Sequence, residues 1–159
     1  MGFYIGIDCS SRSAHFVVLD VDEKIILMDK CIDTSKDVEA RFNSVCTQFN
    51  DYILNQPDLF VDSVATIENP IMIQNMKATI TITNVIAGIK RELFRNDISY
   101  WAVDNKSWKK EVLANGAASK EEILKFAEIK WGKVFTEQDY ADAACIALWG
   151  LVKFGRTRV

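Results

Sequence analysis

Hydrophobic and polar residues along the first part of the chain follow the pattern of β-strands. The segment 4–9, "YIGIDC", is almost continuously apolar, which is typical of a central strand buried on both faces. Residues 14–21 and 24–31 are two further strand-like runs, and the short link "DVDEK" between them predicts a hairpin. We therefore expect the chain to open with a three-stranded antiparallel meander.

A mixture of helices and strands is predicted after the meander. Apolar residues at helical spacing predict an amphipathic helix over 36–56, with an N-cap at Thr34 or Ser35 and an end at Pro57. Residues 61–67 predict a fourth strand that ends in "IENP", and Pro70 suits the start of a helix over 71–95.

The last third of the chain contains one more strand and three helices. Residues 98–103 predict the fifth strand, and a short helix over 104–116 ends at the cap signal Asn115-Gly116. Ser119 and Glu122 form a capping box for a helix that ends near Trp131. An alanine-rich segment, "TEQDYADAACIALWGLVKF", predicts a closely packed last helix. We expect one α/β domain over 1–159, with a five-stranded mixed sheet and helices on both faces.

The composition is that of a globular protein without a membrane part. Hydrophobic residues make up 49% and charged residues 26% of the 159 residues. No apolar run reaches the ~18 residues of a membrane span, and no secretory signal is visible, so we expect a cytoplasmic protein. The four cysteines are scattered and are expected to be reduced. His15 is the single histidine, which argues against a histidine base and against a Cys/His metal site.

The charge is unevenly distributed between the two parts of the chain. Residues 1–70 contain 12 acidic and 5 basic residues, whereas residues 71–159 contain 10 acidic and 14 basic residues. The positive second part is compatible with nucleic-acid binding, although a solvated mixed surface would give the same balance.

Acidic residues occur where strands end and where the last helix is buried. Asp8 ends the first strand, Glu68 ends the fourth, and Asp139 and Asp142 are three residues apart on one face of the last helix. Because sites in open α/β sheets lie at the carboxyl ends of strands, these four acids are expected to meet. Cations must neutralise them, and oxygen ligands alone select Mg²⁺ or Mn²⁺. Two such ions would support phosphoryl transfer. Taken singly, Asp8 could form a turn, Glu68 could cap a helix and Asp142 could be exposed.

Three segments resemble a known family over nearly the whole chain. "GIDCSS", "ATIENP" and "DYADAACIALWG" resemble the RuvC family of Holliday junction resolvases, in the ribonuclease H-like superfamily. The resemblance implies a ribonuclease H-like fold and a homodimer that cuts opposed strands of a four-way DNA junction symmetrically. It also implies two divalent metals bound by Asp8, Glu68, Asp139 and Asp142. The short basic ending is more similar to phage-encoded relatives, so a bacterial or phage-infected host cytoplasm is expected.

Several basic residues are candidates for DNA contacts. Lys109 and Lys120 correspond to lysines of the family, and together with Lys110 they flank a short helix and a helix N-terminus. Arg12 follows Asp8 closely, and Lys77 is a weaker candidate. Each could also be an ordinary solvated side chain.

One segment departs from the family. Bacterial members carry an aromatic wedge after the strand-four glutamate, where this chain has Pro70, Ile71 and Met72. Ile71 or Met72 could act as an apolar wedge or belong to the core. The helix after them is apolar on more than one side, so it could form the dimer contact or be internal, and Gly88 allows close helix packing in either case. A ribonuclease H acting on RNA–DNA hybrids and a non-catalytic nucleic-acid-binding protein on this fold remain alternatives.

Overall fold

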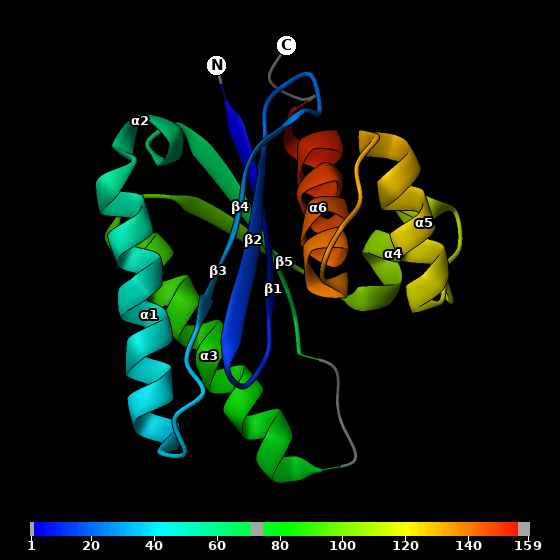
Figure 1. The fold of residues 1–159 in the computed structure, drawn as a ribbon. Helices are drawn as coiled ribbons and strands as arrows, with labels where there is room; N and C mark the ends of the chain where they lie inside the picture. The colour runs from blue at the N-terminus through cyan, green and yellow to red at the C-terminus, as the bar shows by residue number, and fades with distance from the viewer. Residues whose placement is uncertain (1, 71–74, 156–159) are drawn as a thin grey trace.

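The structure, a computed structural model, describes residues 2–70 and 75–155. Its elements are shown in Figure 1. The strands are β1 (Phe3–Cys9), β2 (Ser13–Leu19), β3 (Ile25–Ile32), β4 (Ser63–Glu68) and β5 (Ser99–Val103). The helices are α1 (Val38–Asn55), α2 (Pro57–Phe60), α3 (Met76–Arg95), α4 (Asn105–Leu113), α5 (Lys120–Trp131) and α6 (Gln138–Gly150), followed by the π-helical turn η1 (Leu151–Gly155).

The five strands form one mixed sheet in the order β3-β2-β1-β4-β5. β1, β2 and β3 are an antiparallel meander, and β4 pairs parallel to both β1 and β5. The predicted fold class, a five-stranded mixed sheet that opens with a meander, is therefore confirmed. β1 is the central strand, as its almost continuous apolar run predicts.

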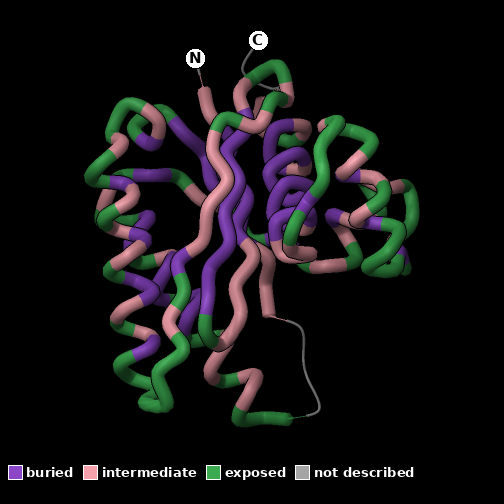
Figure 2. The backbone as a smooth tube through the Cα atoms, viewed as in Figure 1, coloured by how far each residue is buried: buried purple, intermediate pink, exposed green. Residues whose placement is uncertain are grey.

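Helices cover both faces of the sheet (Figure 1). On one face α1 and α3 pack over side chains such as Ile5 and Ile7 of β1. On the other face α6 lies directly on the sheet, with α4 and α5 outside it, and Tyr4 belongs to this second core. Because side chains alternate along a strand, Asp8 lies on the same face as Tyr4, towards α6. Figure 2 shows that the central strands and the sheet-facing side of α6 are the most deeply buried parts.

Alanine allows α6 to pack closely on the sheet, as expected. Ala141, Ala143, Ala144 and Ala147 are all completely buried. The helix consequently lies close enough to β1 for short acidic side chains on both elements to approach one another.

Three predicted helix ends are wrong by a few residues. The N-cap of α1 is Asp37 rather than Thr34 or Ser35, since its carboxylate accepts hydrogen bonds from the amides of the first turn. The helix expected from residue 71 begins at Met76, where Asn75 is the cap. In α4 the left-handed residue is Ala114, with φ of 59°, rather than Gly116. The predicted cap of α5 by Ser119 is confirmed, because its hydroxyl accepts from the Glu122 amide at 3.2 Å.

The predicted wedge residues Ile71 and Met72 lie outside the described residues.

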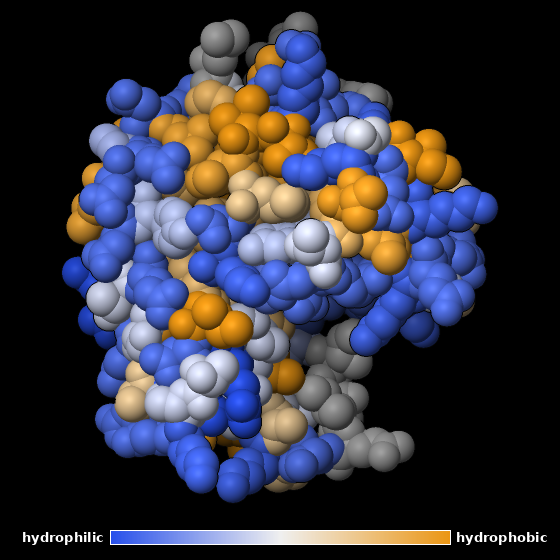
Figure 3. All heavy atoms as spheres, in the orientation of Figure 1, coloured by the Kyte–Doolittle hydropathy of each residue, from blue (hydrophilic) through white to orange (hydrophobic). Residues whose placement is uncertain are grey.

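Within residues 2–70 and 75–155, no helix is both long and apolar enough to cross a membrane. Figure 3 shows a mainly hydrophilic face on which apolar atoms gather over the upper part of the β2–β3 side.

Candidate metal centre

The topology brings Asp8 and Glu68 to one edge of the sheet. β1 and β4 are parallel neighbours in which Ile7 pairs with Ile67, so the residue after each lies at the same level. α6 begins at this edge, which is the lower edge in Figure 1, beside the β1–β2 turn. The expectation that the first and fourth strands are neighbours is therefore confirmed.

Three of the four acids form a compact cluster, which we call the acidic cluster. One carboxylate oxygen each from Asp8, Asp139 and Asp142 lies within 4.8 Å of the other two. Asp139 and Asp142 come from the first turns of α6, on the same side of the helix. The side chains of all three are partly buried.

The charges in the acidic cluster repel one another. Burial, followed by the charges of Asp142, Glu68 and Asp139, raises the pKa of Asp8 well above its usual value. Burial likewise raises the pKa of Asp142 to about 6, and the charges of Glu68 and Asp139 add to this effect. Burial and the neighbouring charges thus both favour the protonated forms of Asp8 and Asp142, and a bound cation would act in the opposite direction.

Glu68 lies beside the acidic cluster and is held by α4. Trp108 donates a hydrogen bond from Nε1 to Glu68 Oε2 at 2.6 Å, and Asn105 donates from Nδ2 to Oε1 at 3.4 Å. Burial raises the pKa of Glu68, while these two hydrogen bonds act in the opposite direction. Glu68 was predicted as a site residue from the sequence, whereas its donors Trp108 and Asn105 were not.

A second group of side chains supports the start of α6. His15 on β2 is buried, and its Nε2 lies 3.2 Å from Glu137 Oε1, while its Nδ1 lies 3.8 Å from Asp139 Oδ2. Lys30 on β3 donates to the other oxygen of Glu137 at 2.8 Å, which is the main reason that the pKa of Glu137 is lowered.

His15 was not among the residues that the sequence predicted to lie at this site. It pairs opposite Asp8 in the β1–β2 ladder. A register assigned to the predicted meander could have indicated this neighbourhood.

The chemistry of the donors fits hard divalent cations. Every side chain in the acidic cluster offers carboxylate oxygen, with no thiolate or imidazole among the donor atoms that converge. After burial, the charges of neighbouring acids contribute to the raised pKa values of Asp8 and Asp142, and a bound cation would offset this repulsion.

The predicted DNA-contacting residues lie on several different elements of the fold. Lys109 on α4 is close enough that its charge lowers the pKa of Glu68 and of Asp142, and its Nζ lies 5.9 Å from the centre of the Trp108 ring. Arg12 is exposed in the β1–β2 turn. The other three are also exposed, on the first turn of α3, on α4 and at the start of α5: Lys77, Lys110 and Lys120.

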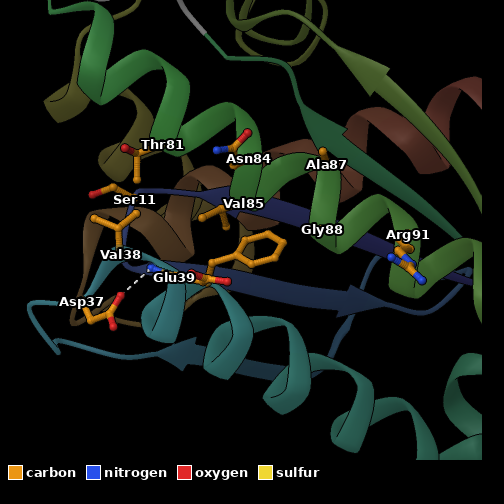
Figure 4. A pocket seen from close by; sticks show the side chains of 11 residues that line it. Ser11, Asp37, Val38, Glu39, Thr81, Asn84, Val85, Ala87, Gly88 and Arg91 are labelled. Carbon is orange, nitrogen blue, oxygen red and sulfur yellow. Dashed lines mark hydrogen bonds between the residues drawn. The ribbon is translucent and has the colours of Figure 1, made fainter.

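A separate groove of about 620 Å³ lies between α1 and α3. Figure 4 shows Val38 of α1 and Val85 of α3 facing into it, with Ser11 at one end and Arg91 at the other. The four acids are absent from its lining, so the groove is not the place where they would act.

Solved structures share the fold of this chain. No protein-family model matches the sequence. No curated protein matches it either. RuvC of T. thermophilus in complex with Holliday junction substrate is similar with a TM-score of 0.82 and 15% identity, over 98% of this chain and 96% of that chain. A second structure of Thermus thermophilus RuvC has a TM-score of 0.79 and 14% identity, over 96% of each chain.

The yeast mitochondrial Holliday junction resolvase Ydc2 is similar with a TM-score of 0.57 and 16% identity, over 97% of this chain and 81% of that chain. The chain therefore has the fold of RuvC resolvases, which is the fold that the resemblance in sequence implied.

Proposed function

We propose that the protein is a metal-dependent, structure-specific DNA endonuclease that resolves four-way junctions by paired symmetric nicks. The observation that carries the proposal is the convergence of Asp8, Asp139 and Asp142 at the carboxyl edge of β1, with Glu68 beside them. The fold shared with RuvC, of which one structure contains Holliday junction substrate, supports the same activity.

The catalytic role is assigned to the four acids. Two Mg²⁺ or Mn²⁺ ions bound there would activate water and neutralise charge on the leaving oxygen of a phosphodiester. Asp8 and Glu68 would hold the ions from the sheet, and Asp139 and Asp142 would hold them from α6. His15 and Glu137 fix the first turn of α6, and Gln138 donates to Asp142 at 3.1 Å.

DNA binding is assigned to the basic residues around this edge. Lys109 is placed best, because its charge already acts on the acids. Lys110, Lys120, Arg12 and Lys77 are further candidates for phosphate contacts. Selectivity would come from the shape of branched DNA rather than from base contacts.

A homodimer would place two such sites on one junction. On α3, Met76, Ile80 and Phe94 are 77%, 54% and 74% exposed and lie on one side of the helix. The groove of Figure 4 runs along the same helix. We assign the dimer contact to this outward stripe of α3, while the opposite side of the helix packs in the core.

A cleavage assay on three substrates tests the proposal. The protein is incubated with Mg²⁺ and a synthetic four-way junction, a matched linear duplex or an RNA–DNA hybrid, with Asp8→Asn as the inactive control. We expect paired symmetric nicks with 5′-phosphates in the junction alone. Cleavage of the hybrid alone would instead indicate a ribonuclease H, and tight binding without cleavage in Mg²⁺ or Mn²⁺ would indicate a non-catalytic binding protein.

A further inference from the structure

Trp108 points its single polar atom at a side chain of the candidate metal centre. Its ring is completely buried, and its Nε1 lies 2.6 Å from Glu68 Oε2. Asn105, one turn earlier on α4, donates to the other oxygen at 3.4 Å. Each oxygen of the Glu68 carboxylate therefore has a hydrogen-bond donor, and both donors come from the same helix.

The arrangement follows from the way α4 leaves the sheet. Glu68 pairs with Val103, the last residue of β5, so α4 starts next to the carboxylate. Asp104 caps the helix by accepting from the Ser107 amide at 2.7 Å. Asn105 and Trp108 are three residues apart and share the side that faces Glu68. The buried ring packs in the core below α6, which fixes the direction of its N–H group.

The hydrogen bond of Trp108 could position Glu68, or it could only give the indole N–H a partner. The hydrogen bond of Trp131 helps to distinguish these two roles. Trp131 also needs a partner for its indole N–H and donates to the backbone oxygen of Glu23 at 2.7 Å, at the opposite edge of the sheet. A backbone oxygen is sufficient where an indole N–H needs no more than a hydrogen-bond partner. Trp108 uses a carboxylate whose charge acts on Asp8 and Asp142.

Hydrogen bonds from α4 are compatible with metal binding by the same oxygens. Each carboxylate oxygen has two acceptor positions, so Oε2 can accept from Trp108 and still coordinate a cation. Ligating carboxylates are commonly oriented by such outer hydrogen bonds, and their loss typically costs about 10–100-fold in metal affinity or activity.

We propose that Trp108 and Asn105 are positioning residues that hold the Glu68 carboxylate in place for the cations of the acidic cluster. This inference rests on the proposed function, because it concerns the same metal centre. The proposed positioning role also means that α4 would contribute to both metal binding and DNA binding. The helix holds Glu68 through Trp108, and the next residue, Lys109, is the best-placed candidate for a phosphate contact. DNA bound at Lys109 would therefore stabilise the helix that positions Glu68.

The first test observes Trp108 directly in the unmodified protein. The chain has 4 tryptophans, so its ¹H–¹⁵N spectrum contains few indole signals. Trp→Phe variants of the other tryptophans assign the indole signal of Trp108 by elimination. During titration with Mg²⁺, we expect the Trp108 indole signal to move with the same midpoint as the backbone amides of Asp8 and Asp142. The Trp131 indole signal should stay in place.

Two results would overturn the inference in different ways. If the amides of Asp8 and Asp142 respond to Mg²⁺ while the Trp108 indole moves no more than that of Trp131, the metal centre stands and the positioning role fails. If none of these amides responds, the metal centre itself is absent, and the proposed function fails together with the inference.

The second test uses matched variants. Trp108→Phe and Trp131→Phe each remove one hydrogen-bonded indole N–H and keep an aromatic ring. We expect Trp108→Phe to weaken Mg²⁺ binding, measured by calorimetry, by about 10-fold, and Trp131→Phe to leave it within about twofold. Equal effects of the two variants would show a merely structural role. Asn105→Ala, which leaves the ring in place, should weaken binding by a smaller factor, and unchanged affinity would remove Asn105 from the proposal.

Discussion

A methyl group added at Gly6 would lie 2.0 Å from the backbone oxygen of Ala143, so β1 and α6 touch at a point where only a hydrogen atom fits. Gly6 lies two residues before Asp8 on the same face of β1, and Ala143 directly follows Asp142 on α6. This contact therefore determines how closely the acids of the sheet and of the helix approach. The candidate metal centre depends on a packing contact that contains no acid.

Gly6→Ala should push α6 away from β1. Because the obstacle is backbone rather than a flexible side chain, we expect a loss of about 3 kcal/mol in the free energy of unfolding, measured by urea denaturation. Mg²⁺ affinity should fall as well, because the distance between Asp8 and Asp142 increases. Gly116→Ala is the control, since its new methyl group would meet its nearest atom at 3.5 Å, an ordinary contact. Equal stability of the two variants would contradict the proposed close approach.

Asp8→Asn should abolish cleavage while junction binding is retained or strengthened, because the substitution removes a proposed metal ligand and a negative charge from the proposed site of phosphate binding. Cleavage is measured in Mg²⁺, and binding by gel shift without divalent ions. Asp51→Asn, on the exposed side of α1, is the matched control and should behave as wild type. Loss of junction binding in Asp8→Asn would argue against a catalytic role for this residue.

The stability of the metal-free protein should depend on pH through Asp142. Its pKa is about 6 in the folded chain, against 3.8 for an ordinary aspartate, so the folded state binds more protons than the unfolded state between these values. The stability contributed by this group is therefore fully present below the lower value and is lost as the pH rises through the upper one.

Thermal unfolding in EDTA at several pH values measures this effect. Between pH 4 and 7, the Tm of the wild type should fall relative to that of Asp142→Asn, and saturating Mg²⁺ should remove the relative loss. Curves that stay parallel across this range would show that Asp142 is not perturbed.

Lys109→Ala should weaken junction binding and reduce its salt dependence. Loss of one phosphate contact lowers the slope of log K against log salt by about 1. Binding isotherms at four salt concentrations measure the slope. Lys24→Ala, in the exposed β2–β3 turn at the opposite edge of the sheet, is the control. A slope equal to that of the control would remove Lys109 from the DNA surface.

Ile80→Asp should dissociate the proposed homodimer, because it places a charge in the middle of the outward stripe of α3. Light scattering coupled to gel filtration measures the mass of the particle. Ile129→Asp is the control, since Ile129 is 73% exposed on α5, away from this stripe. A wild-type protein that is monomeric at micromolar concentration would refute this assignment of the interface.

Most of the fold could be predicted from local patterns, whereas three of the helix ends could not. The almost continuous apolar run of β1 indicated a central strand, and Ser119 with Glu122 indicated the start of α5. The start of α1 was misplaced because Asp37, Thr34 and Ser35 are all good caps, and packing of the helix on the sheet decides among them.

Local patterns in the chain were enough to predict which acids could act together, because strand ends and helical spacing place Asp8, Glu68, Asp139 and Asp142 on predictable positions of regular elements. The side chains that surround these acids depend on tertiary packing. Trp108 reaches Glu68 from 40 residues away, and His15 reaches Glu137 from 122 residues away. Such contacts depend on strand register and on how closely α4 and α6 pack against the sheet, and neither leaves a periodic signal in the chain.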